Sequence, residues 1–391
     1  MQDATHEEPV RDIMGRFARK TGLSSSTQSP ERYLWTDAFA VCNFLELYRR
    51  TGQDKYRQQA LDLVEQVHGI LGKHRDDDPR SGWISGLDDE TGHSHPTIGG
   101  LRIGKRLGER KWNQPFDAQL EWDRDGQYYH YLTKWMHALH QVSAVTADPV
   151  YNQWTCELGK TMHRAFAHRL GAGAEKRLYW KMSIDLTFPL VPSMGHHDPL
   201  DGLVTYSEVQ RPSVSQSATV SPCDLTSEMA DLAGMCRHRM WATDDPLGIG
   251  GLLFDACRML QMMADTPGFK DHDLLCDVLG SSTVGLRSFS ASGYLRARSE
   301  ERLAFRELGL AIGLHAVPRM LAWLQDNTEF QVHDVVKDQL NRLMAAVPLA
   351  RSIETFWLHP SNRQSVNWQA HENINMVMLA TSLAPDGFLS V

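Results

Sequence analysis

Several features common in membrane, secreted or metal-binding proteins are missing from this sequence. No apolar run approaches the ~20 residues that a membrane-spanning helix needs. The stretch Met1–Glu8 is acidic and has no apolar core, so no secretory leader is visible. The six cysteines are scattered, without a CxxC pair, which is typical of reduced, buried thiols. These absences predict a cytoplasmic protein that does not associate with membranes.

Basic clusters are also missing. The formal net charge is −8 and no run of Lys and Arg occurs, which argues against nucleic acid as a partner because phosphate contacts need clustered basic residues. The segment Gly99–Arg106 resembles a phosphate loop but lacks the GxxxxGK[ST] order, so it is interpreted as a flexible lid.

Metal-binding patterns are weak. The segment His93–His95 together with Asp88 and Asp89, and the segment His196–Asp198, carry ligand-type residues. Neither has the spacing of an HExxH motif or of a four-ligand Cys/His set. No metal and no cofactor are therefore expected.

What the sequence does contain is a repeated pair of helices. An apolar helix is followed by a short turn and then by an amphipathic helix, and such hairpins cannot bury their apolar faces alone. The expected apolar inner helices are 32–48, 126–145, 199–209, 247–264, 301–324 and 367–383. The expected outer helices are 55–74, 149–168, 225–240, 271–288 and 331–349, with the helix at 8–20 as a sixth.

Six such hairpins predict an all-α fold, an (α/α)6 toroid that takes up residues 1–391 as one domain. The main candidate for a short β-hairpin is Tyr179–Leu190. Connections from outer to inner helices are long, above all 75–124, which is expected to be an active-site loop. The N-terminal ends of the inner helices are therefore the expected working end, where helix dipoles face the cavity.

The stretch Glu121–His140 contains several side chains of the types that carry out catalysis. As a helix starting near Asp125, it carries a second stripe of His130, Lys134 and His137 in place of a freely charged solvent face. Such a stripe is typical either of a polar cavity or of half-buried, structurally satisfied histidines. Asp125 itself is either a catalytic carboxylate or a helix N-cap.

This layout resembles the six-hairpin glycosidase superfamily, which includes unsaturated glucuronyl and rhamnogalacturonyl hydrolases and N-acylglucosamine 2-epimerase-like isomerases. The residues that carry the resemblance are Arg32–Phe39, Asp125–His130 and Asn367–Glu372, each opening an inner helix with aromatic and polar groups. The resemblance spans nearly the whole chain at the level of architecture. It implies a carbohydrate-active enzyme with a small-molecule saccharide substrate that could be anionic.

Sugar-binding sites combine aromatic faces with hydrogen-bonding groups, and both gather at the predicted working end. Large aromatic residues also fill helical cores, so each aromatic candidate has a structural alternative. The substrate-binding candidates are Arg32, Trp35, Trp83, Tyr128, Tyr129, Lys134, His196, His197, Trp357, Trp368 and Asn367.

Two reactions fit these residues. Glycoside hydrolysis by general acid/base catalysis, the favoured hypothesis, needs two carboxyl groups. The candidates are Asp37 and one of Asp88, Asp89 or Asp125, with His130 and His371 as partners. The alternative is a sugar 2-epimerase or isomerase that uses His130, His197 or His371 as acid and base. A third hypothesis is a non-catalytic helical toroid that binds a ligand or a protein.

Overall fold

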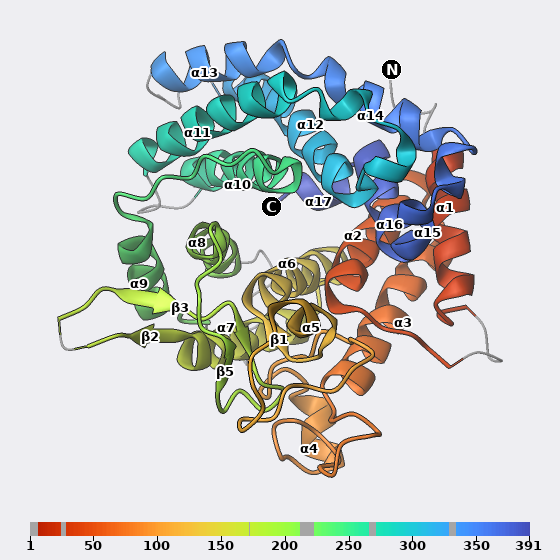
Figure 1. The fold of residues 1–391 in the computed structure, drawn as a ribbon, viewed down its shortest axis with the longest axis vertical. Helices are drawn as coiled ribbons and strands as arrows, with labels where there is room; N and C mark the ends of the chain where they lie inside the picture. The colour runs from red at the N-terminus through yellow and green to blue at the C-terminus, as the bar shows by residue number, and fades with distance from the viewer. Residues whose placement is uncertain (1–6, 25–28, 172, 212–222, 266–270, 328–333) are drawn as a thin grey trace. The chain divides into compact units, whose positions relative to one another are not determined.

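The computed structural model describes residues 7–24, 29–171, 173–211, 223–265, 271–327 and 334–391. Helices dominate the described residues (Figure 1). Contacts along the chain form two compact units, Ala18–Arg237 and Met1–Phe17 with His238–Val391, here called the N-terminal unit and the C-terminal unit. The predicted helical hairpins appear in each unit.

The N-terminal unit is built from three helical hairpins. The long helices α2, α6 and α8 pack side by side, α2 on α6 and α6 on α8, and each packs on the helix that follows it. The hairpins are α2 (Leu34–Thr51) with α3 (Asp54–Leu71), α6 (Tyr129–Thr146) with α7 (Val150–Phe166), and α8 (Asp198–Val209) with α9 (Thr226–Cys236). Two short helices, α4 (Asp89–Ser94) and α5 (Ala118–Asp123), lie within the long loop 75–124.

The C-terminal unit is also built from inner helices covered by outer ones. Helix α12 packs on α10 and α16, while α11, α13 and α14 cover them. The elements are α1 (Glu7–Lys20), whose first part belongs here, α10 (Pro246–Asp265), α11 (His272–Ala291), η2 (Tyr294–Arg296), η3 (Ser299–Glu301), α12 (Ala304–Asp326), α13 (Asp334–Met344), α14 (Pro348–Leu358), η4 (Asn362–Gln364), α15 (Val366–Ala370), α16 (Glu372–Leu383) and α17 (Asp386–Leu389).

Glycines let α10 and α12 approach each other closely. A methyl group added at Gly250 would lie 2.1 Å from the carbonyl oxygen of Gly309, and one at Gly313 would lie 2.6 Å from the Cα of Gly250. Contacts this short do not occur between real atoms, so the two helix backbones touch at the only residue type without a side chain. The crossing therefore depends on these three positions.

The inner helices are apolar because they are covered on all sides, as their sequence predicts. In α2 every residue from Leu34 to Leu47 is buried, and the helix ends where Gly52 adopts a left-handed conformation with φ 66° and donates to the carbonyl of Tyr48. The outer helix α3 instead alternates buried and exposed residues. The predicted division into inner and outer helices is confirmed for these elements.

Two predicted helices are interrupted. The expected helix 331–349 is divided between α13 and α14, which begins at Pro348 because proline fits the first turn of a helix and not its interior. The expected helix 367–383 is divided at His371, which lies outside the helical region with φ −126° and is the N-cap of α16.

Helix α6 begins later than the sequence suggests, and its N-cap is Tyr128. The prediction that Asp125 caps this helix is wrong. Gly126 has a φ of 149°, and Gln127 and Tyr128 form the short strand β1, which pairs with Lys181 and Met182. Pairing with a strand more than fifty residues away therefore delays the helix.

The strands form two small antiparallel sheets. In one, β4 (Lys181–Met182) lies between β1 and β5 (Pro189–Val191), and in the other β2 (Ala167–Arg169) pairs with β3 (Lys176–Leu178). The pairing of β4 with β5 confirms the hairpin predicted near Tyr179–Leu190.

Two cysteines contradict the expectation of reduced thiols. Cys156 of α7 and Cys223, just before α9, form a disulfide that joins residues 67 positions apart. Cys42, Cys236 and Cys257 are buried and lie outside this disulfide. Scattered spacing gave no sign of the pair, because the packing of α9 beside α7 and α8 brings the two thiols together. The cysteines therefore do not indicate a cytoplasmic location.

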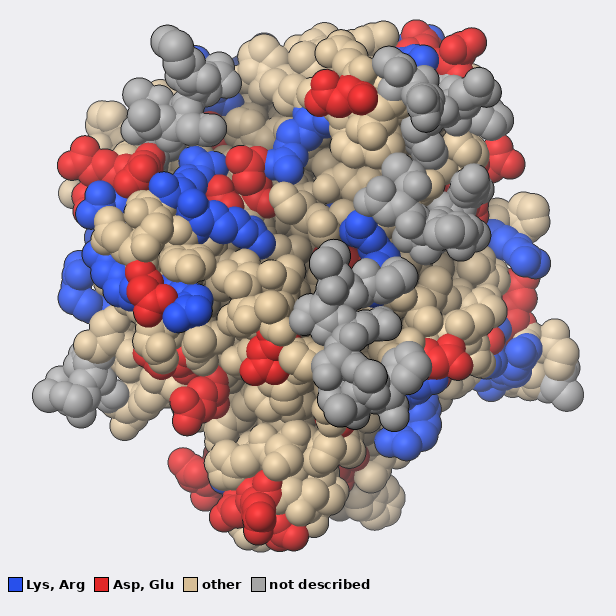
Figure 2. Space-filling view, turned by 180° about the vertical axis from the view of Figure 1, so that it is seen from behind, with Lys and Arg blue, Asp and Glu red and all other residues tan. Residues whose placement is uncertain are grey.

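The surface carries charges of both signs. On the face that Figure 2 shows, basic and acidic side chains are interspersed, and acidic side chains gather at the end where Figure 1 places α4. Among the described residues, no helix combines the length and the apolar character needed to cross a membrane.

Candidate functional site

The polar stripe of α6 faces acidic residues on α8. Lys134 forms an ion pair with Asp201, which also accepts a hydrogen bond from Thr133. Nδ1 of His137 lies 2.9 Å from both carboxylate oxygens of Glu208, and neither side chain is exposed. The sequence could not choose between a cavity lining and a structural stripe for these residues. For Lys134 and His137 the structure shows paired, buried groups at the helix interface.

His130 differs from the rest of this stripe because 29% of its side chain is exposed. Its Nδ1 lies 3.8 Å from Oδ1 of Asp198 at the start of α8. Its ring stacks on Trp180, with centroids 6.2 Å apart and an interplanar angle of 14°, and it lies within 5.4 Å of the rings of Tyr128 and Tyr131. We call Tyr128, His130, Tyr131, Trp180 and Asp198 the His130 cluster.

Part of the His130 ring is exposed, but its Nδ1 is shielded from solvent. This burial lowers the pKa of His130 to about 4, and Lys134 acts in the same direction while the carboxylate of Asp201 partly opposes it. At neutral pH the imidazole is therefore uncharged and can accept a proton. A histidine that reaches solvent beside a carboxylate is placed for general acid/base chemistry, although a pKa of about 4 makes its neutral form a weaker base than an ordinary imidazole.

Further aromatic side chains extend the His130 cluster toward the start of α2. The hydroxyl groups of Tyr33 and Tyr131 lie 2.8 Å apart, and the ring of Trp35 lies 6.3 Å from that of Tyr131. The ammonium group of Lys105 lies 5.4 Å from the centre of the Tyr33 ring. The N-terminal ends of α2, α6 and α8 thus meet in the N-terminal unit, as expected for the working end.

Asp37 and Arg32, both predicted site residues, lie together beneath this surface. Asp37 is 1% exposed, accepts a hydrogen bond from the backbone N–H of Tyr33 at 2.9 Å, and lies 3.5 Å from the guanidinium group of Arg32. Burial raises the pKa of Asp37 to about 6, although Arg32 and the Tyr33 N–H act in the opposite direction. The pair secures the first turn of α2.

Asp125 is fully buried and surrounded by donors. Its carboxylate accepts hydrogen bonds from the backbone N–H of Gly104 at 3.0 Å, from Arg102 at 3.0 Å and from Arg75 at 3.3 Å. It also accepts from the N–H of Gly126. Asp125 therefore fastens two parts of the long loop to the start of β1, and these four donors surround its carboxylate.

Asp88 and Trp83 support the loop 75–124. Asp88 is the N-cap of α4 and accepts from the N–H of Thr91 at 2.8 Å. Trp83 is 3% exposed, packs against Gly92 and donates to Asp89 at 3.2 Å. Both are far more engaged in local structure than the sequence suggested.

Three other predicted residues lie near α8. Tyr129 is fully buried and packs edge to face on Phe166 at 5.5 Å. His197 is the N-cap of α8, and its ring lies 4.6 Å from that of the exposed His196. His196 and His197 therefore directly precede Asp198, the residue whose carboxylate lies near His130.

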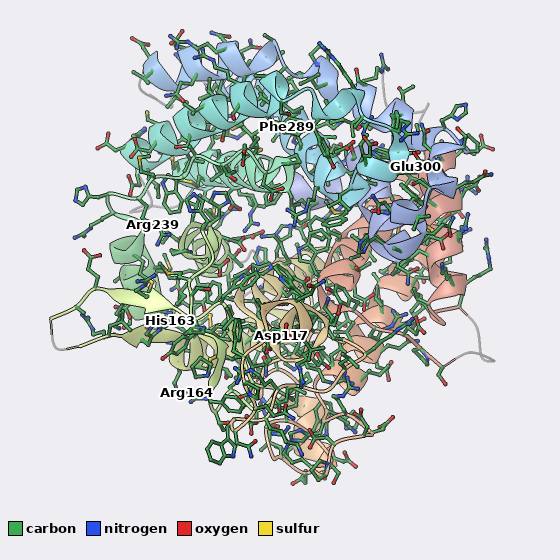
Figure 3. The ribbon with its side chains drawn as sticks, in the orientation of Figure 1. Asp117, His163, Arg164, Arg239, Phe289 and Glu300 are labelled. Carbon is green, nitrogen blue, oxygen red and sulfur yellow. A yellow bond between two sulfur atoms is a disulfide. The ribbon has the colours of Figure 1, made fainter. Side chains whose placement is uncertain are left out.

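The remaining predicted residues belong to the C-terminal unit. Trp357 and Trp368 are at most 2% exposed and stack on each other at 5.5 Å. Trp357 donates to Glu307 at 2.9 Å, and Asn367 donates to the carbonyl of Glu300, which Figure 3 labels. These side chains join the start of α12 to α14 and α15. The two tryptophans pack as core residues within this unit, and Asn367 is half-buried.

His371 is exposed at the N-terminus of α16, with its ring 5.5 Å from that of Phe305 at the start of α12. It therefore lies at the N-terminal ends of two inner helices of its own unit, the position expected for a functional residue.

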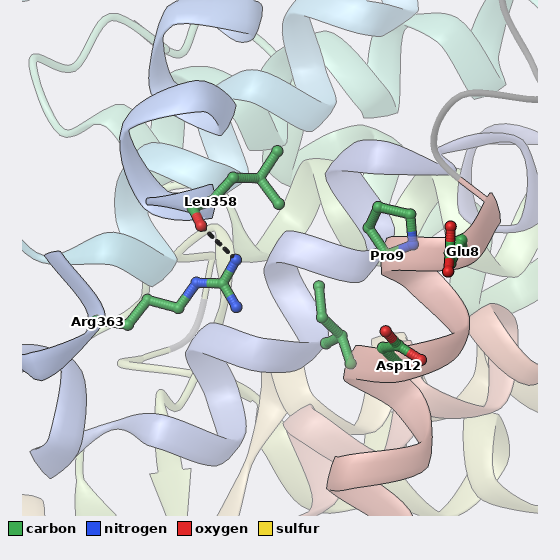
Figure 4. Close-up of a pocket in the computed structure, with 6 residues that line it drawn as sticks. Glu8, Pro9, Asp12, Leu358 and Arg363 are labelled. Atoms are coloured by element: carbon green, nitrogen blue, oxygen red, sulfur yellow. Dashed lines mark hydrogen bonds between the residues drawn. The ribbon is translucent and has the colours of Figure 1, made fainter. Parts of the chain in front are cut away.

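A pocket of about 310 Å³ lies elsewhere in the C-terminal unit (Figure 4). It is lined by residues of α1 and α14 and by Arg363, which donates to the carbonyl of Leu358 at 2.8 Å. It includes none of the predicted site residues. Within the described ranges, no group of three His, Cys, Asp or Glu side chains is arranged to hold a metal ion.

Sequence reasoning left Trp180 and Tyr131 out of the site. Both were visible, since Trp180 opens the predicted β-hairpin and Tyr131 directly follows His130. The spacing of Asp198 and Asp201 on α8 matches that of His130 and Lys134 on α6 to within one residue, which was a further usable signal.

No protein-family model matches the chain, and no curated protein matches it in sequence. Solved structures do match over almost the whole chain. The GH76 α-mannanase of Bacteroides thetaiotaomicron has a TM-score of 0.54 at 8% identity, covering 98% of this chain and 97% of that one. A D-mannose isomerase has a TM-score of 0.52 at 8% identity, covering 98% of each chain.

The cellobiose 2-epimerase of Bacillus thermoamylovorans has a TM-score of 0.51 at 10% identity, covering 97% of this chain and 99% of that one. The chain therefore has an (α/α)6 fold, as these solved structures do. This confirms the fold class that the six hairpins predicted and, at the level of the fold, the resemblance. At such identities the likeness fixes the fold alone, and the chemistry has to be argued from the side chains.

Proposed function

We propose that the protein is a carbohydrate-active enzyme that moves a proton at a sugar carbon, as an epimerase or isomerase does, with His130 as the base. The observation that carries the proposal is the position of His130, which is partly exposed, lies against aromatic rings, and has its Nδ1 3.8 Å from the carboxylate of Asp198. Aromatic faces suit the C–H faces of a sugar, and an uncharged imidazole suits proton transfer.

In this mechanism Nε2 of His130, the ring nitrogen that does not face Asp198, removes the proton from the carbon next to the carbonyl group of an open-chain sugar. The electron pair of the broken C–H bond passes to the carbonyl oxygen and gives an enediolate. Return of the proton to the other face of the same carbon inverts it, while return to the neighbouring carbon exchanges aldose and ketose. The carboxylate of Asp198, 3.8 Å from Nδ1, stabilises the imidazolium formed in between.

A second acid/base group returns the proton or protonates the carbonyl oxygen. His197 and His371 remain the candidates for this role, each at the N-terminus of an inner helix. The proposal draws support from the fold as well, since a D-mannose isomerase and a cellobiose 2-epimerase share it.

Glycoside hydrolysis is the second candidate function. Asp37 favours it, because a carboxyl group with a pKa of about 6 can hold a proton near neutral pH as a general acid does. The α-mannanase with this fold favours it too. Against it, Asp37 is 1% exposed and Asp125 is surrounded by donors, so neither carboxylate reaches solvent in this state.

The test is to incubate the protein in D₂O with mannose, fructose, glucose, cellobiose and α-manno-oligosaccharides and to follow the sugars by NMR. Deuterium should enter at the carbon next to the carbonyl, and His130→Asn should reduce the rate at least a hundredfold. The matched control is His140→Gln on the same helix, whose ring contacts Asn152 instead of the cluster. New reducing ends without deuterium at carbon would replace the proposal with hydrolysis.

A further inference from the structure

The long loop carries a concentration of exposed aromatic side chains. Among the described residues, the exposed Trp and Phe side chains are Trp112, Phe116 and Trp122, with 81%, 55% and 51% of their surface accessible. They all lie within residues 112–122, next to and within α5. Exposed aromatic side chains that gather in one place are a common sign of a binding surface.

This segment is held in place from several sides. Asp117, labelled in Figure 3, caps α5 by accepting from the N–H groups of Gln119 and Leu120. Arg110 lies 5.8 Å from the centre of the Phe116 ring and forms an ion pair with Glu121 at 3.0 Å.

The ammonium group of Lys181 on β4 completes the anchoring. It is buried and donates to the carbonyl oxygens of Glu121 and Arg124 at 2.7 and 2.8 Å. The rings of Phe116 and Trp122 are therefore exposed on a fixed backbone, and loose packing of the loop does not explain their exposure.

The exposed rings continue into the His130 cluster. Trp122 packs edge to face on Trp180 with centroids 5.0 Å apart, and Trp180 in turn stacks on His130 at 6.2 Å. Lys181, which donates to Glu121 of α5, lies on the strand that pairs with β1. We call Trp122 and Trp180 the aromatic row.

We propose that the aromatic row binds the sugar units of an oligosaccharide beyond the unit that reacts at His130. The inference rests on the proposed function and narrows its substrate class, from any small sugar to a saccharide of two or more units. The row runs from an exposed edge of the loop to the proposed base. A molecule bound along it would therefore reach His130, which favours a saccharide substrate over a protein partner. Each flat ring matches the C–H face of one sugar unit.

The first experiment is steady-state kinetics on cello-oligosaccharides and α-manno-oligosaccharides of one to five units. Trp122→Ala should raise KM at least tenfold for the longer saccharides, with kcat little changed and with no effect on the monosaccharide. The control is Trp112→Ala, an exposed tryptophan on the same loop outside the row, which should change KM less than twofold.

Binding measured without turnover separates this inference from the proposed function. Calorimetric titration of His130→Asn with the same oligosaccharides should show binding that Trp122→Ala weakens at least tenfold. If wild-type protein binds oligosaccharides through Trp122 but exchanges no deuterium, the proposed function fails and the aromatic row stands.

If deuterium exchange occurs but Trp122→Ala leaves KM unchanged for saccharides of every length, the proposed role of the aromatic row is overturned and the proposed function stands. Light scattering provides the other decisive outcome. A dimer that Trp122→Ala converts to a monomer would show that a second copy covers these rings and would overturn the inference.

Discussion

The indole N–H of Trp135 donates a hydrogen bond to Nε2 of His68 across 3.1 Å, in a place where the indole is inaccessible to solvent and the imidazole is 5% exposed. The bond joins α6 to α3. It requires an unprotonated Nε2, since a histidine nitrogen that carries a proton is a donor. Burial lowers the pKa of His68 to about 3. An inner and an outer helix are thus fastened by a group that has to stay uncharged.

This arrangement predicts a contribution to acid unfolding. The folded-state pKa of His68 lies below its unfolded value near 6.5, so its contribution to stability is complete above pH 6.5 and is lost as pH falls toward 3. Between pH 6 and 4 the free energy of unfolding should fall by about 1.4 kcal/mol per pH unit because of this residue alone. His68→Gln should remove that part of the slope in urea unfolding. Trp135→Phe should leave it, because burial and not the hydrogen bond lowers the pKa.

The glycine contact between α10 and α12 predicts opposite effects at neighbouring positions. Gly250→Ala should destabilise the protein by about 2 kcal/mol or more, because its methyl group would overlap the backbone of Gly309. Gly251→Ala meets only the ring of Phe254 at 3.7 Å, and it should be neutral or stabilising by up to about 1 kcal/mol. Chemical unfolding of the two variants checks both signs. Equal destabilisation would mean that the close crossing is not present.

Asp125 should be worth far more to stability than its neighbour Asp123. Asp125→Asn leaves Arg75 and Arg102 without their buried carboxylate, and we expect a loss of about 3 kcal/mol. Asp123 is exposed, so Asp123→Asn should change the free energy of unfolding by less than about 0.5 kcal/mol. Should Asp125→Asn fold with full stability yet lose activity, the carboxylate would have a direct catalytic role.

The disulfide can be tested by counting thiols. Denatured, unreduced protein should show four reactive thiols and not six, because Cys156 and Cys223 are joined. In the chain-entropy description, a loop of this length stabilises by about 4 kcal/mol, so reduction or Cys223→Ser should lower the melting temperature. Cys276→Ser, which removes a free thiol, is the control. Six thiols in the unreduced protein would contradict the pairing.

The pH dependence of catalysis follows from the state of His130. A base must be unprotonated, so the rate should fall on the acid side as pH drops through about 4, the pKa that burial gives this histidine. An unshifted histidine would lose half its rate near pH 6.5. Initial rates of deuterium exchange between pH 3.5 and 8, with circular dichroism at each pH to confirm folding, decide between them. An acid limb near pH 6.5 would point to another base.

Local sequence patterns predicted the helical hairpins well, because burial on all sides leaves apolar helices and burial on one side leaves amphipathic ones. The same patterns placed His130 at the start of an inner helix. They could not show that Lys134 and His137 face Asp201 and Glu208, since these partners lie about seventy residues away on α8. Whether a polar stripe lines a cavity or meets a complementary stripe depends on that distant helix.

The other differences between the predicted and the observed structure also arise from contacts between distant segments. Helix α6 starts at Tyr129 because β1 pairs with β4, and Cys156 meets Cys223 because α9 packs beside α7 and α8. Trp180 joins the site through the hairpin that carries it. In each case the decisive contact connects segments that no short window of sequence contains.

Lys181 has a consequence for the thermodynamics of ligand capture. Its buried ammonium group fixes the backbone that bears Trp122 before any ligand arrives. A ligand that stacks on a preorganised ring loses little affinity to the ordering of the protein. Ligand binding at this loop should therefore be enthalpy-driven, with a small entropic penalty from the protein. Shortening the Lys181 side chain should make the entropy of binding more unfavourable, even though this buried side chain does not touch the ligand.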